Sequence, residues 1–129
     1  MSQPAPIKND YPAAWDMAIK AVQNVENIDK KLLDFLVAEM RKRDDLGLKR
    51  YGVRLQPFNG RDAQTDCFEE ILDAFVYSIQ SDYEDYVECM AEGKDAPEGK
   101  LSNLIGGVLL EMTKILMTGS KWIATSPPK

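Results

Sequence analysis

Residues 62–79, DAQTDCFEEILDAFVYSI, decide the fold class of this chain. Apolar side chains recur there at i, i+3, i+4, i+7 and i+11, the spacing of an amphipathic helix: Phe68, Ile71, Leu72, Phe75 and Ile79. Asp62 stands where a helix N-cap is expected. Whether this helix ends near Ser81 stays open. Ser81 and Glu84 have the spacing of a capping box, yet the apolar stripe continues to Met90.

The same spacing recurs in the other segments. Pro12 favours the start of a first helix, and Asp29 is a plausible N-cap for a second helix that ends at Gly47. Ser102 is placed to cap a final helix that ends at Gly119. No segment alternates as a strand does, and no internal repeat is visible. We therefore predict an all-α bundle of four to five helices.

One long basic loop is expected between the second and third helices, at residues 48–61, LKRYGVRLQPFNGR. The pair Asn59-Gly60 is a strong turn signal, and connections this long are often functional. The length of 129 residues suits a single domain. We predict a flexible N-terminus at 1–10, an all-α domain at 11–124 and a flexible tail at 125–129.

Composition excludes several classes of function. The formal net charge of −5 disfavours direct binding to nucleic acid or to an anionic membrane. The chain has no His, which removes His-dependent triads and His-ligated zinc. Metal and acid–base chemistry must then use carboxylates, Lys, Tyr or Cys.

The two cysteines do not predict a disulfide. On one continuous helix, Cys67 and Cys89 would lie roughly 33 Å apart at about 1.5 Å per residue, whereas a disulfide needs Cα atoms within about 7 Å. Isolated thiols fit a reducing compartment, so a cytoplasmic location is expected. No apolar stretch resembles a signal peptide or a membrane span of about 18 residues, so no membrane association is expected.

Charge is distributed unevenly along the chain. Ten carboxylates and no Lys or Arg lie between Asp62 and Gly93, directly after a cationic stretch. Four carboxylates share one face of the expected third helix: Asp66, Glu69, Glu70 and Asp73. Uncompensated like charges at helical spacing repel each other. An ordinary solvated surface is one interpretation, and bound Mg²⁺ or Mn²⁺ is the other, because hard cations prefer oxygen ligands.

The basic loop also allows two interpretations. Its cations could grip the phosphate oxygens of a nucleotide: Lys49, Arg50, Arg54 and Arg61. Alternatively, Lys49 and Arg50 merely balance the net charge or pair with Asp44 and Asp45 near the end of a helix. Tyr51 or Phe58 could stack on a base or simply hold the loop against the core.

The run Glu69–Tyr77, EEILDAFVY, resembles the EE-x-x-D segment of MazG-like all-α nucleoside triphosphate pyrophosphohydrolases. The wider stretch Tyr51–Tyr77 is similar to small phage and bacterial proteins grouped loosely with that superfamily. The resemblance implies a helical core, carboxylate-bound Mg²⁺, a dimer or tetramer, and cleavage of a nucleoside triphosphate to the monophosphate and pyrophosphate.

Carried over residue by residue, Glu70 and Asp73 match the metal ligands of that motif. The family's EExxE motif is absent from the preceding helix, LLDFLVAEMRKRDDLG, where Glu39 is the best candidate for a facing ligand. Asp66 is a further candidate ligand, and Glu69 a candidate to orient or deprotonate water. The rival hypothesis is a non-catalytic acidic protein that binds a basic partner, even as a nucleic-acid mimic. A third is a structural oligomer built on the last helix, Leu104–Met117.

Overall fold

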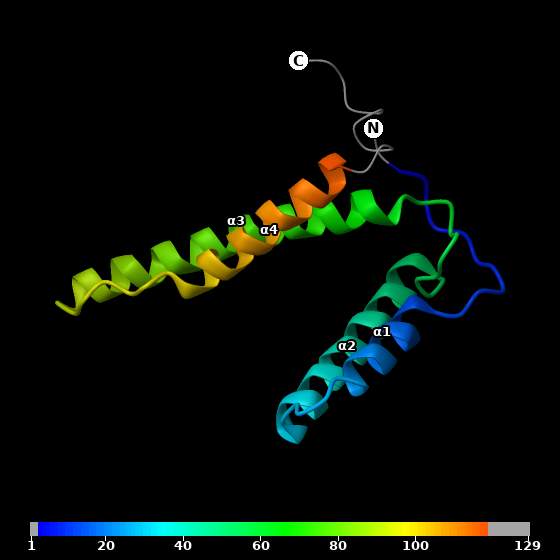
Figure 1. Cartoon of the computed structure of the whole chain (residues 1–129), viewed down its shortest axis with the longest axis horizontal. Coiled ribbons are helices and arrows are strands. Elements are labelled where there is room, and N and C mark those ends of the chain that lie inside the picture. Colours follow the sequence, from blue (N-terminus) through cyan, green and yellow to red (C-terminus); the bar gives the residue numbers. More distant parts are fainter. Residues whose placement is uncertain (1–2, 119–129) are drawn as a thin grey trace, which may run out of the picture. The chain divides into compact units, whose positions relative to one another are not determined.

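The computed structural model describes residues 3–118, and all regular elements in that range are helices (Figure 1). They are α1 (Ala14–Gln23), α2 (Lys30–Tyr51), α3 (Ala63–Ala91) and α4 (Lys100–Thr118). The predicted all-α class is therefore confirmed for the described residues. The predicted helix end at Gly119 and the tail 125–129 lie outside them.

The chain divides into two compact units, Met1–Asp62 and Ala63–Lys129. Each unit is built on a helical hairpin, with α1 packed along α2 in the first and α4 packed along α3 in the second (Figure 1). Within residues 3–118 the two hairpins contain four helices, in agreement with the predicted four to five. Each unit is described below by itself.

α2 is longer than its sequence predicts. The prediction that Gly47 ends this helix is wrong, because α2 runs through Gly47 to Tyr51. A glycine inside a helix costs only about 0.5–1 kcal/mol, which a helix of this length tolerates. The helix ends instead at Gly52, whose φ of 76° lies in the left-handed region and whose N–H bonds to the Leu48 carbonyl at 2.8 Å. The basic loop therefore covers residues 52–62.

α3 is one continuous helix from Ala63 to Ala91, which settles the question at Ser81. It begins directly after Asp62, where the sequence predicts. Cys67 and Cys89 are both free, and they lie near opposite ends of this helix.

α3 and α4 pack through small residues. A Cβ added at Gly106 would lie only 3.1 Å from Cε1 of Phe75, so the ring sits against the α4 backbone at this point. Ser78 is buried, with 2% of its surface exposed, and its hydroxyl donates to the Phe75 carbonyl at 2.7 Å. Leu116 is buried near the other end of α4. Phe75 and Ser78 thus mark the side of α3 that faces α4.

The start of α4 is fixed by a residue from α3. Ser102 does not cap the helix as predicted, because α4 already begins at Lys100. Instead Oδ2 of Asp82 accepts a hydrogen bond from the Ser102 backbone N–H at 2.9 Å. Gly99 precedes the helix with a φ of 66°. The Asp82 carboxylate thus satisfies a first-turn N–H that would otherwise lack a helical partner.

Candidate functional site

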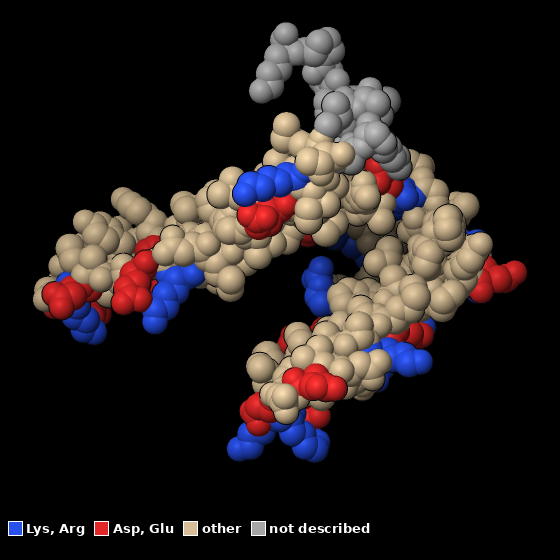
Figure 2. Space-filling model, in the orientation of Figure 1, with Lys and Arg blue, Asp and Glu red and all other residues tan. Residues whose placement is uncertain are grey.

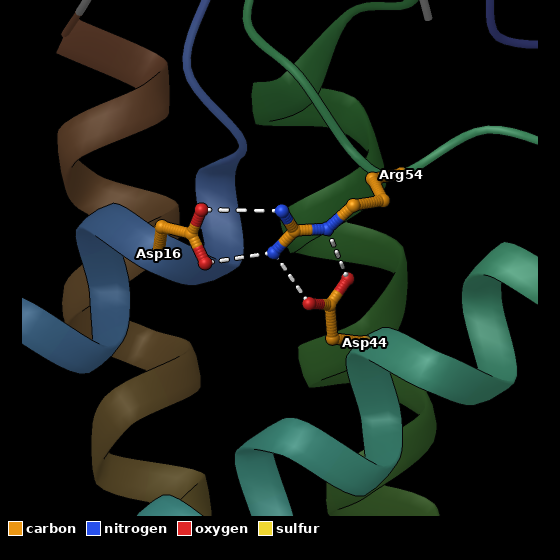
Figure 3. Close-up of polar contacts among 3 residues, drawn as sticks. All are labelled: Asp16, Asp44 and Arg54. Atoms are coloured by element: carbon orange, nitrogen blue, oxygen red, sulfur yellow. Dashed lines mark hydrogen bonds and ion pairs between the residues drawn. The ribbon is translucent and has the colours of Figure 1, made fainter.

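Arg54 joins three segments of the first unit (Figure 3). It leaves the loop after α2 and reaches Asp16 on α1 and Asp44 on α2. Its Nη2 lies 2.7 Å from Oδ1 of Asp16 and 2.6 Å from Oδ2 of Asp44. Nη1 bonds Asp16 at 3.1 Å, and Nε bonds Asp44 at 3.2 Å. Both carboxylates are gripped bidentately, a geometry that suits the planar guanidinium.

We call Arg54, Asp16 and Asp44 together the Arg54 clamp. Its contacts shift the pKa values of Asp16 and Arg54. The hydrogen bonds from Arg54, supported by the charges of Arg54 and Arg41, lower the pKa of Asp16 below its ordinary value of 3.8. The same two carboxylates raise the pKa of Arg54. Asp44 is the better shielded partner, with 12% of its side chain exposed against 57% for Asp16. The sequence did not reveal this pairing, because Asp16 lies 38 residues from Arg54.

The loop 52–62 is held by the segment before α1. Asn9 donates through Nδ2 to the carbonyls of Pro57 and Phe58 at 2.8 and 3.0 Å. Gln56 donates in return to the carbonyls of Asn9 and Tyr11, at 2.8 and 2.7 Å. The N-terminal segment that the sequence predicts to be flexible, residues 1–10, is described from Gln3 onward. These hydrogen bonds join its Asn9 to the loop of the first unit.

The turn at the centre of the loop is built on Asn59, which is buried. Its carbonyl accepts from the N–H of Ile7 at 3.0 Å, and its side chain accepts from the N–H of Arg61 at 3.1 Å. Phe58 has a positive φ of 54° and is 77% exposed, and its ring centroid lies 4.8 Å from that of Tyr11. An aromatic pair therefore marks the outer face of the turn.

The four predicted phosphate-binding cations differ in their surroundings. Arg54 is committed to the clamp, and Nη1 of Arg61 donates to the Pro4 carbonyl at 2.7 Å. Lys49 and Arg50 lie exposed in the last turn of α2, and neither forms an ion pair within residues 3–118. The Arg50 guanidinium carbon lies 5.4 Å from the Tyr51 ring centroid. Lys49 and Arg50 are thus the cations left for an anionic ligand.

The predicted metal ligands on α3 lie in its first three turns. Glu69, Glu70 and Asp73 are exposed, and Asp66 is half-buried. α3 contains eight carboxylates and no Lys or Arg, so its own sequence supplies no compensating cation. Past the first turn, the helix dipole also offsets little of their repulsion.

Glu39, the predicted facing ligand, belongs to α2. Its Oε1 lies 3.0 Å from Nζ of Lys42, one turn further along the same helix. Within residues 3–118, no three His, Cys, Asp or Glu side chains gather closely enough to hold a metal ion. A complete protein cage is therefore absent from the described part of the chain, and any cation here needs oxygens from elsewhere.

Comparison with protein-family models, with curated proteins and with solved structures finds no match for this chain. The resemblance to MazG-like enzymes therefore rests on the sequence alone, on the motif Glu69–Tyr77 and the wider stretch Tyr51–Tyr77. By length and composition only, α4 also meets the criteria for a membrane-crossing helix. A core helix of a soluble protein meets the same criteria, so the expectation of no membrane association stays a prediction.

Proposed function

We propose that this protein is a Mg²⁺-dependent nucleoside triphosphate pyrophosphohydrolase of the MazG-like kind, working in the cytoplasm as a homo-oligomer. The observation that carries the proposal is the set of exposed carboxylates of Glu69, Glu70 and Asp73 in the first three turns of α3, a helix that contains no Lys or Arg. Ordinary surface helices offset such charge with Lys or Arg at i+4. A divalent cation would offset it here.

The residues fit Mg²⁺ in chemistry and number. Mg²⁺ prefers hard oxygen ligands and commonly uses only one or two protein carboxylates, with water and substrate phosphates completing its shell. Glu70 and Asp73 lie one turn apart on one face and would hold the ion, with Asp66 one turn earlier. When bound, the ion supplies charge neutralisation on the triphosphate.

The other roles in the reaction are assigned to side chains of this protein. Glu69 lies on the same helix face and would accept a proton from the attacking water. The water oxygen bonds to the α-phosphorus as the bond to the bridging oxygen breaks, which releases pyrophosphate and leaves the monophosphate. Lys49 and Arg50 are proposed to hold phosphate oxygens. Arg54 holds the base of the loop through Asp16 and Asp44, and we assign it a positioning role.

One observation favours the alternative of a non-catalytic acidic protein. All eight carboxylates of α3 lack a basic neighbour on that helix, including those past Ser81 that no metal motif includes. A basic partner would be attracted by the whole surface. Binding of that kind is sensitive to salt, indifferent to Mg²⁺, and spread over many carboxylates.

The test is a panel of ribo- and deoxyribonucleoside triphosphates, incubated with the protein in Mg²⁺ and in excess chelator. We expect equal amounts of monophosphate and pyrophosphate from at least one triphosphate in Mg²⁺, and neither product in chelator. Release of inorganic phosphate with the diphosphate would indicate a different bond cleavage. No turnover of any triphosphate would favour the acidic binding protein.

A further inference from the structure

α3 carries an apolar seam that its hairpin leaves uncovered. Six large side chains recur along it at alternating intervals of four and three residues, the spacing of a coiled-coil seam. Their exposed fractions are 39, 63, 48, 66, 46 and 45% in chain order: Leu72, Val76, Ile79, Tyr83, Tyr86 and Met90. We call this set the α3 seam.

The α3 seam is distinct from the two other sides of the helix. The side that packs on α4 carries Phe75, Ser78 and Asp82. The predicted metal ligands form a separate acidic side. At about 100° per residue, the three sides are spaced around the helix. In the view of Figure 2, much of the surface over α3 and α4 carries neither acidic nor basic side chains.

The seam is partly organised already. The ring centroids of Tyr83 and Tyr86 lie 6.4 Å apart, with 31° between their planes, so two seam side chains already pack on each other. Tyrosine loses little conformational freedom on binding and offers a large contact area. No charged residue occupies any of the six seam positions.

We propose that the α3 seam binds the α3 seam of a second copy of this chain, with the two helices antiparallel. A two-fold axis near Ser81 places each seam side chain opposite a residue of a different type. Leu72 meets Met90, Val76 meets Tyr86, and Ile79 meets Tyr83 of the second copy. A tyrosine then faces an aliphatic side chain in the middle four of the six layers, which keeps the volume of the layers even.

Charge selects the antiparallel direction. A parallel pair would place the carboxylates around Glu70 at the same level in both copies, where they repel each other. The antiparallel pair separates these two groups by roughly 34 Å at about 1.5 Å per residue. Asp73 then lies at the level of Cys89 of the second copy and Glu70 at that of Glu92, so each group meets fewer carboxylates than in the parallel pair.

The size of the seam suits such a dimer. From Leu72 to Met90 it is about 27 Å long, and an identical seam covers all of it. Six half-exposed side chains of this size offer several hundred Å² per copy, of the order of the roughly 800 Å² per partner in a standard interface. Monomeric proteins rarely expose a contiguous apolar patch of that size. The seam dimer rests on the homo-oligomer of the proposed function and specifies its interface, whereas no seam residue takes part in the proposed hydrolysis.

Sedimentation equilibrium of the full chain tests the interface. We expect a mass of twice 14.5 kDa or a multiple of it for the unaltered protein. The double variant V76E/Y83E should raise the dissociation constant at least about tenfold, because it buries carboxylates in the seam. Y77E is the matched control: Tyr77 is 67% exposed but points away from the seam, so this variant should associate like the unaltered chain. A monomer at all concentrations, or equal weakening by Y77E, would overturn the proposal.

Cross-linking tests the direction independently of stability. In a chain carrying C67S and C89S, the pair V76C and Y86C should form covalent dimers on mild oxidation, because these positions meet in the antiparallel pair. The two are too far apart on one helix to bond within a chain. V76C alone should stay uncross-linked. Covalent dimers from V76C alone would show a parallel pair and overturn the antiparallel arrangement.

Discussion

Oδ2 of Asp82 accepts a hydrogen bond from the backbone N–H of Ser102 at 2.9 Å, so a side chain of α3 fixes the first turn of α4. The two residues lie 20 positions apart, across the connecting loop. The contact does for α4 what an N-cap side chain usually does from within its own helix. It also sets the register in which Phe75 meets Gly106 further along the hairpin.

Asp82→Ala should therefore loosen the start of α4. We expect a loss of about 0.5–2 kcal/mol in the free energy of unfolding, the usual effect of removing a capping side chain. Amide hydrogen exchange at Ser102 should become faster, while exchange in the middle of α4 changes less. Asp85→Ala is the control, since Asp85 lines the same shallow depression as Asp82. Unchanged exchange at Ser102 would contradict the capping role.

Gly47 and Gly52 form a natural pair for testing the end of α2. Gly52→Ala should destabilise the chain by about 1–2 kcal/mol, because its φ of 76° is left-handed. Gly47→Ala should stabilise it by about 0.5–1 kcal/mol, because a Cβ there meets nothing within 4 Å in the described structure. Urea unfolding followed by circular dichroism measures both. Equal effects of the two substitutions would mean that α2 ends elsewhere.

Arg54→Lys keeps the charge but loses the planar fork that grips two carboxylates. We expect a loss of about 1 kcal/mol in the free energy of unfolding, a modest figure because the Arg54 side chain is 37% exposed and solvent screens the pairs. Arg43→Lys, an exposed substitution on α2, should leave stability unchanged. If Arg54→Lys is equally silent, the clamp does not hold the first unit together.

Acid should weaken the same clamp. The pKa of Asp16 is lowered in the folded chain, chiefly by its hydrogen bonds to Arg54, so its contribution to stability is present above the ordinary value of 3.8. That contribution is lost as the pH falls through the lower folded pKa. The stability difference between the unaltered chain and Asp16→Asn should therefore shrink below about pH 4. A difference that persists at pH 2 would show that Asp16 acts through packing rather than charge.

Helical periodicity was sufficient to predict the fold class, because Phe68, Ile71 and Phe75 recur at the spacing of a packed face. The same stripe did not show which neighbouring helix each of its side chains packs against. Leu72 and Ile79 were expected to face inward with them, yet they are 39% and 48% exposed and belong to the α3 seam. A single apolar stripe in the sequence can thus serve two neighbours, and the spacing alone does not separate them.

Local signals failed where a distant residue decided the outcome. Ser102 is of a residue type that often caps helices, but it is the Asp82 carboxylate that accepts a hydrogen bond from a backbone N–H in the first turn of α4. The pairing of Arg54 with Asp16 and Asp44 was likewise not predicted, and its expected contact with phosphate stays a prediction. Glu69, Glu70 and Asp73 are exposed on α3. The sequence was sufficient to predict that they share a face, because helical geometry alone determines which residues do. Their role as metal ligands remains a proposal.

The most direct test of the central claim is pyrophosphate release by substituted proteins in Mg²⁺. We predict that Glu70→Gln and Asp73→Asn each reduce kcat/KM at least about 100-fold, a loss of roughly 3 kcal/mol of transition-state stabilisation, with helical content unchanged by circular dichroism. Glu84→Gln, which removes one carboxylate elsewhere on α3, should retain the activity of the unaltered chain. Undiminished turnover in both Glu70→Gln and Asp73→Asn would contradict the account.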